Sequence, residues 1–147
     1  MSLALTSVIS SCTEDDISVV DCNGIPGTKP VDDIKKCING KWKVIGYYNL
    51  DNVLEYEDEN RYIEFYQSDS LSWIYADSSR YTYSFEWIVF ENPLLKEEIN
   101  LIKIHRYDSE YELLIFFKEH TSDTLSIHEQ YFPLRGVTSV LVRSNDK

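Results

Sequence analysis

The sequence predicts an all-β fold, an eight-stranded antiparallel up-and-down barrel preceded by a short helix. First, segments that alternate apolar and polar residues follow one another, and their links are short, polar and free of helical crossovers. Second, the composition includes 11 tyrosines, and aromatic residues favour strands. Third, 147 residues suit one domain, and closing the sheet removes its exposed edges.

The N-terminal residues are typical of an exported protein. Residues 2–11 are apolar or small and uncharged, and they are too few to span a bilayer. Ile9-Ser10-Ser11-Cys12 resembles the lipobox of bacterial lipoproteins, in which the cysteine is lipidated and becomes the mature N-terminus. We therefore interpret residues 1–11 as the remnant of a signal peptide and Cys12 as a membrane anchor. The alternative is an ordinary N-terminus with a free thiol.

Residues 12–30 are predicted to be a tether with turns and no regular element, because Gly and Pro are frequent in it. Its acidic start, residues 14–16, resembles the export signal of surface lipoproteins of the Bacteroidetes type, which implies the outer membrane of a cell envelope. Cys22 and Cys37 are expected either to form a disulfide or to remain two separate thiols.

The barrel domain is assigned to residues 31–147. Residues 30–40 have the marks of a short helix, with acidic residues in the first turn, lysines in the last and Asn39-Gly40 as a left-handed stop. Residues 39–48 form the first strand, and its alternation places Trp42 on the inner face, where it plugs one end. An acidic loop follows at residues 49–60. The other strands are expected at residues 61–66, 71–75, 80–87, 98–105, 111–118, 123–129 and 137–143.

The Gly40-Lys41-Trp42 triplet on the first strand, after a helical turn, resembles the lipocalin and calycin pattern. In that family a basic residue near the end of the last strand stacks over the tryptophan, and Arg143 is at the matching place. The resemblance implies that Gly40, Trp42 and Arg143 close the barrel, through a cation–π contact between the last two. It covers residues 34–145 and is greatest to lipocalin-like lipoproteins of gut Bacteroidetes. The family's middle-loop motifs and its helix after the eighth strand are missing.

Aromatic side chains dominate the predicted inner face and are the candidate lining of a pocket for a small apolar or planar ligand. The alternatives are that they fill a small barrel, or that they form an external surface for a protein partner. The candidate residues are Tyr48, Tyr62, Trp73, Tyr75, Tyr81, Tyr83, Phe85 and Trp87.

Other classes of function have little support. A net charge of -11 opposes nucleic-acid binding, and no motif for catalysis or phosphate binding occurs, so no enzyme and no cofactor are expected. His105, His120 and His128 lack the close spacing of zinc ligands. The acidic loop, with Glu55, Glu57, Asp58 and Glu59, lacks the ordered spacing of calcium loops. We therefore expect no metal site.

The sequence thus predicts a monomeric, non-enzymatic lipoprotein, anchored to the membrane through Cys12, whose barrel binds a small apolar ligand. The alternative is an interaction or structural module at the envelope surface, with a filled core and no ligand site.

Overall fold

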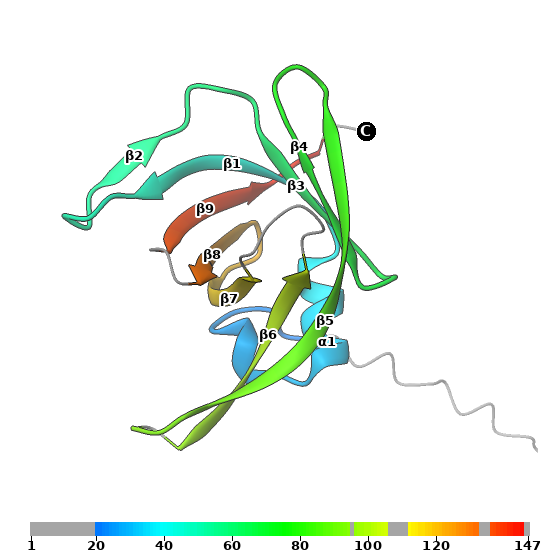
Figure 1. Cartoon of the computed structure of the whole chain (residues 1–147), viewed down its shortest axis with the longest axis vertical. Helices are drawn as coiled ribbons and strands as arrows, with labels where there is room; N and C mark the ends of the chain where they lie inside the picture. Colours follow the sequence, from blue (N-terminus) through cyan, green and yellow to red (C-terminus); the bar gives the residue numbers. More distant parts are fainter. Residues whose placement is uncertain (1–19, 95, 106–111, 133–135, 146–147) are drawn as a thin grey trace, which may run out of the picture.

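The computed structural model describes residues 20–94, 96–105, 112–132 and 136–145. A 3-10 helix, η1 (Pro26–Thr28), and an α-helix, α1 (Val31–Ile38), precede the strands (Figure 1). Within the described ranges the strands are β1 (Gly40–Tyr48), β2 (Leu54–Tyr56), β3 (Tyr62–Tyr66), β4 (Ser70–Ile74), β5 (Arg80–Asn92), β6 (Glu97–His105), β7 (Glu112–His120), β8 (Thr124–Phe132) and β9 (Val137–Arg143).

The sheet closes on itself. Every neighbouring pair is antiparallel, from β3 through β9 in sequence order, and β1 pairs with both β3 and β9. Strands β1 and β3 to β9 therefore form an eight-stranded closed barrel, which confirms the predicted fold class. β1 and β9 run side by side in Figure 1, so the first and last barrel strands make the seam.

Strand β2 lies within the segment that the sequence predicted to be a loop. It pairs with the last residues of β1, Gly46 to Tyr48, beside the stretch that β3 occupies on the same edge. Gly46 permits this approach, because a Cβ atom there would lie 2.4 Å from the carbonyl oxygen of Glu55. Only three residues long and largely exposed, β2 carries too little alternation to be recognised from sequence.

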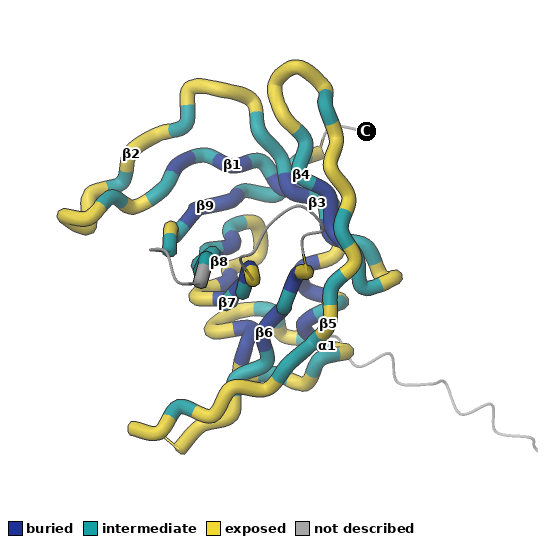
Figure 2. Tube along the Cα trace, viewed as in Figure 1, coloured by how far each residue is buried: buried dark blue, intermediate teal, exposed yellow. Residues whose placement is uncertain are grey.

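Strand β5 is longer than predicted. It pairs with β4 through Arg80 to Ser84 and with β6 through Phe85 to Asn92, so one strand serves both neighbours in succession. Its second half contains Ile88-Val89-Phe90, an apolar run that hides the period of two. This half extends beyond the barrel body, and Figure 2 shows exposed residues along it and at its tip.

The N-terminal elements pack on the barrel, and η1 corrects the prediction that the tether holds no regular element. Pro26 and Gly27 of η1 are buried, and a Cβ atom on Gly27 would lie 2.8 Å from the Ile99 side chain. The side-chain amide of Asn100 donates to the Lys29 carbonyl oxygen at 2.9 Å. Helix α1 buries one face, and the chain leaves it through Gly40, with a φ of 108°.

The hydrophobic core lies inside the barrel near α1. Inward-facing positions alternate with outward ones along β1, β3 and β7, as the dark segments of these strands in Figure 2 show. The buried cluster consists of Ile34, Ile38, Trp42, Val44, Ile63, Phe65, Leu71, Ile102, Ile104, Leu113, Ile115, Phe117, Leu125, Ile127 and Leu141. None of its members comes from the first residues of β5 or from the end of β8. This cluster therefore does not fill the barrel interior there.

Candidate functional site

One end of the barrel is closed around Trp42. Its side chain is fully buried, and its indole nitrogen donates to the Ile38 carbonyl oxygen of α1 at 2.7 Å. The Arg143 guanidinium lies 4.1 Å from the Trp42 ring centroid. Arg143 also donates to the carbonyl oxygens of Asn39 at 2.9 Å and Cys37 at 2.8 Å, so one cation stacks on the ring and binds the end of the helix.

His120 and a disulfide complete this end. The His120 ring packs edge-on against Trp42 at 5.6 Å, and its Nε2 lies 3.3 Å from the Cys37 carbonyl oxygen. Burial lowers the pKa of His120, and the charge of Arg143 acts in the same direction. The backbone of His120 also forms two hydrogen bonds with Gly24, and Cys22 and Cys37 are joined with Cα atoms 5.4 Å apart. We call these residues the plugged end.

A cavity of about 770 Å³ opens at the other end, where β3 and β5 begin and β4 and β8 end. It is lined by Glu59, Arg61, Trp73, Tyr75, Ala76, Asp77, Ser79, Tyr81, Tyr83, Glu129 and Tyr131. Two aromatic pairs form much of its wall: Trp73 meets Tyr83 edge-to-face at 5.4 Å, and Tyr75 meets Tyr81 at 5.7 Å. Such a wall presents flat apolar faces together with phenol groups.

Glu129 is the unusual member of this lining. Its Oε1 atom is shielded from solvent and has no hydrogen-bond partner in the part of the chain that the structure describes. Burial raises the pKa of its carboxyl group, while a hydrogen bond from Trp73 and the charge of Arg61 act in the opposite direction. Beneath it lies a further cavity of about 20 Å³ that Val44, Ile63 and Glu129 help to line.

Arg61 is the one basic residue of the lining, and its charge is already paired. Its Nη2 lies 2.7 Å from Oε2 of Glu57, and its Nε donates to the same oxygen at 3.0 Å. The other charged residues of the lining are Glu59, Asp77 and Glu129. Hydrogen bonds from Ser79 lower the pKa of Asp77, which favours its ionised form. The cavity therefore carries an excess of negative charge.

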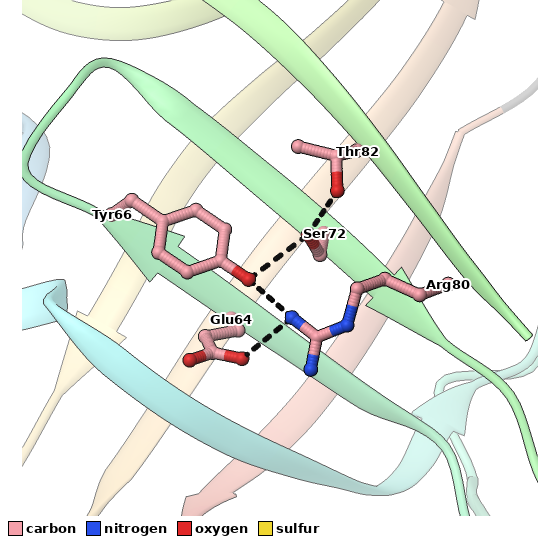
Figure 3. Close-up of polar contacts among 5 residues, drawn as sticks. All are labelled: Glu64, Tyr66, Ser72, Arg80 and Thr82. Carbon is pink, nitrogen blue, oxygen red and sulfur yellow. Dashed lines mark hydrogen bonds and ion pairs between the residues drawn. The ribbon is translucent and has the colours of Figure 1, made fainter. Parts of the chain in front are cut away.

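The wall of the cavity is braced from outside (Figure 3). Arg80 donates to Tyr66 and, at 3.1 Å, to Glu64, and Tyr66 in turn contacts the buried Ser72 at 3.1 Å. Ser72 also bonds Thr82 at 2.6 Å. These residues lie on the outer face of β3, β4 and β5, between the inward positions that bear the aromatic wall, and the network links all three strands.

The structure divides the eight predicted lining residues. Trp73, Tyr75, Tyr81 and Tyr83 line the cavity. Phe85 and Trp87 instead pack against the core, where Trp87 stacks on Phe117 at 6.0 Å. The remaining two do not line this cavity, which corrects the prediction. Tyr48 is 40% exposed at the end of β1. Tyr62 has the outward parity of β3, with Lys41 Nζ 4.4 Å from its ring centroid, and borders only the cavity of about 20 Å³.

Sequence reasoning missed Arg61, Glu129 and Tyr131. Glu129 and Tyr131 continue the inward alternation of Leu125 and Ile127 on β8. The predicted strand ended at residue 129, which left out Tyr131, and Glu129 was not recognised as an inward position. The sequence signal for Glu129 was this alternation, because it places the carboxyl group of Glu129 on the inner face of the barrel.

The other sequence candidates are apart from the cavity. His105 pairs with Glu86 at 3.2 Å, and His128 bonds Thr138 at 2.8 Å. No group of three or more His, Cys, Asp or Glu side chains in the described ranges is placed to hold a metal ion. No helix of the same ranges is long and apolar enough to cross a membrane. Cys12 lies outside the described residues.

The closed antiparallel barrel, the preceding helix and the Trp42–Arg143 stack decide the fold type. The fold is lipocalin-like. A solved structure similar to this chain is that of a lipocalin-like protein from Bacteroides uniformis ATCC 8492, with 15% sequence identity and a TM-score of 0.45. The match covers 73% of this chain and 98% of that one. No family model and no curated protein matches the sequence.

Proposed function

We propose that this lipocalin-like chain is a non-enzymatic binding protein that takes a small, largely apolar molecule with a flat ring into the cavity at the open end. The observation that carries the proposal is the division of the barrel interior. Core side chains, Trp42 among them, fill one half. In the other half Trp73 and Tyr83, which also pack against the core, join Tyr75 and Tyr81 around open space.

The size and chemistry of the cavity support this function. A volume of about 770 Å³ lies within the range of small-molecule sites, roughly 300 to 1,000 Å³. Eight strands can enclose either packed side chains or one small ligand, and here the barrel has both regions. Tyr81 and Tyr75 remain 53% and 39% exposed, so their rings are available to a ligand.

A fluorescence titration tests the proposal. The neutral apolar dye N-phenyl-1-naphthylamine is expected to bind saturably, and Tyr81→Ala is expected to weaken its binding about tenfold, since a stacked ring contributes up to about 1.5 kcal/mol. Tyr56→Ala is the matched control, because Tyr56 is an exposed strand tyrosine on β2, outside the cavity lining. Equal loss in both variants, or no saturable binding, would favour the alternative of an interaction or structural module.

The proposed setting is the cell envelope, with Cys12 lipidated and attached to the outer membrane. Its support is the Ile9-Ser10-Ser11-Cys12 segment, together with a disulfide between Cys22 and Cys37, which suits an oxidising compartment. Mass spectrometry of the protein from its native membrane is expected to find a mature N-terminus at Cys12 with acyl chains. An intact Met1 with an unmodified Cys12 would overturn this part of the proposal.

A further inference from the structure

The charged side chains that line the cavity indicate which chemical class of ligand it binds. Three carboxyl groups, of Glu59, Asp77 and Glu129, line it, against one guanidinium, of Arg61. Arg61 is engaged by Glu57, which is outside the lining. A ligand that enters therefore meets uncompensated negative charge in a confined and partly apolar space, where an ionic contact is stronger than in water.

Glu129 gives this charge a specific position. Glu59 and Asp77 lie at exposed positions, where water solvates them, whereas Oε1 of Glu129 is shielded and without a partner in the described residues. A buried polar atom without a hydrogen bond is costly, and a shielded carboxylate most of all. Glu129 lines the cavity, so a ligand there that draws the carboxyl group round to a hydrogen-bond donor removes this cost, and a cationic donor also neutralises the charge.

The surrounding rings suit the same kind of ligand. Trp73, Tyr75, Tyr81, Tyr83 and Tyr131 present aromatic faces or edges to the cavity. Aromatic faces attract organic cations, and they also stack on a planar ring. The lining thus offers a carboxyl group for a cationic head and rings for an apolar body.

We propose that the ligand is a small aromatic amine in its protonated form, with its ammonium group on Glu129 and its ring among the cavity tyrosines. This inference rests on the proposed function, and it adds the chemical class of the ligand. An anion is disfavoured by the three carboxyl groups, and a purely apolar molecule leaves Oε1 unpartnered.

Three indole probes that differ in one group test the proposal by calorimetric titration of the folded protein. Tryptamine carries an ammonium, tryptophol a hydroxyl and indole-3-propionate a carboxylate. Tryptamine is expected to bind about tenfold tighter than tryptophol, in line with the strength of a charge-assisted hydrogen bond, and indole-3-propionate is expected to bind weakest. Glu129→Gln is expected to remove the preference for tryptamine while tryptophol affinity stays within about twofold.

Glu86→Gln is the matched control, because Glu86 lies on the outer face of β5 and pairs with His105. It is expected to leave the order of the probe affinities unchanged.

A second experiment uses the wild-type protein alone, so it does not depend on the folding of any variant. As the pH falls through the raised pKa of Glu129, tryptamine affinity is expected to fall and tryptophol affinity to stay constant. The other titratable groups of the lining are Glu59, Arg61, Asp77, Tyr75, Tyr81, Tyr83 and Tyr131.

The outcomes separate the two proposals. Equal affinities for tryptamine and tryptophol would overturn the amine assignment and leave the binding function intact. This result is expected if a water molecule in the 20 Å³ cavity donates a hydrogen bond to Glu129. A tryptamine preference that survives Glu129→Gln would also overturn it. Tighter binding of indole-3-propionate would point instead to Arg61. The absence of binding by every probe, including N-phenyl-1-naphthylamine, would reject the binding function itself.

Discussion

The two ends of this barrel differ in how they are built: one is packed and cross-linked, and the other surrounds a cavity. At the plugged end, the Trp42 indole N–H and both terminal nitrogens of Arg143 are hydrogen-bonded to backbone carbonyl groups, and a disulfide lies beside them. At the open end, tyrosines remain exposed around a cavity that Glu129 lines. Each end holds one buried side-chain atom without a hydrogen-bond partner among the described residues, His120 Nδ1 at the plugged end and Glu129 Oε1 at the open end.

This difference indicates where stability and binding reside. Dense packing and hydrogen-bonded buried groups stabilise a fold, whereas open space lowers stability and is found where a ligand completes the site. The barrel combines both because antiparallel strands run from one end to the other, so a rigid plug fixes the strands that carry the cavity wall. The following predictions test this contrast.

The largest loss of stability is expected from replacing Trp42, which plugs one end of the barrel. Trp42→Ala is predicted to lower the free energy of unfolding by about 3 to 5 kcal/mol, because it leaves a void and strips Arg143 of its stacking partner. Trp73→Ala, in the cavity wall, is the matched control and is expected to cost about half as much. Urea unfolding measures both. Equal losses would show that the two ends contribute alike.

Removal of the disulfide comes next. Cys22 and Cys37 are 15 residues apart, and opening a loop of this size costs about 3 kcal/mol. Cys22→Ser with Cys37→Ser is predicted to lower the unfolding free energy by this amount while affinity for N-phenyl-1-naphthylamine is unchanged. A loss of dye binding in the folded variant would mean that the plugged end shapes the cavity directly.

Glu129→Gln is predicted to stabilise the protein, by about 1 to 2 kcal/mol at pH values where the Glu129 carboxyl group is ionised, since a neutral amide is easier to bury than a carboxylate. In the wild type the folded state keeps this proton at a pH where the unfolded chain has lost it. Folding stability therefore falls as the pH rises from about 4.5 through the raised pKa. Thermal unfolding at a series of pH values should show this fall, relative to Glu129→Gln; parallel curves would contradict it.

His120 is expected to give a pH dependence of the opposite sign. Its pKa is lowered in the folded protein, so the unfolded chain takes up a proton first when the pH drops below about 6.5. Stability is then lost on acidification, at up to about 1.4 kcal/mol per pH unit. His120→Gln should flatten the difference between pH 7 and pH 5.5. If the dependence of stability on pH is unchanged in this variant, His120 is not its cause.

The smallest effect on stability is expected from Tyr81→Ala, at about 0.5 kcal/mol, because the ring is half exposed. The same change is predicted to weaken dye binding, so affinity and stability separate at the open end. Chemical denaturation and dye titration of one preparation measure the two quantities. A destabilisation above about 2 kcal/mol would place Tyr81 among the core residues.

Local alternation was sufficient to predict most strands and the closed barrel, because side chains with a period of two have one inner face. The lipocalin-like triplet also directed attention to Trp42 and Arg143, which lie in contact. The failures have physical causes. β2 is held by Gly46 and its neighbours on β1, which is a tertiary effect, and η1 packs through buried Pro26 and Gly27, residues that otherwise indicate turns.

The sequence predicted only some of the residues that line the cavity. An aromatic alternation predicted Trp73, Tyr75, Tyr81 and Tyr83, but the register between distant strands decides which other residues join them. Glu129 reaches the cavity because β8 lies across the barrel from β4 in the closed order. Tyr62 failed for a simpler reason: it occupies the outward parity of a strand whose neighbours Ile63 and Phe65 are buried.

The chain enters the barrel at the plugged end, since Val20 lies near Cys37, His120 and Arg143. Were Cys12 embedded in a bilayer, the seven residues between it and Val20 would keep Val20 within about 30 Å of it. The plugged end would then be the tethered end of the barrel, and the cavity lies at the opposite end.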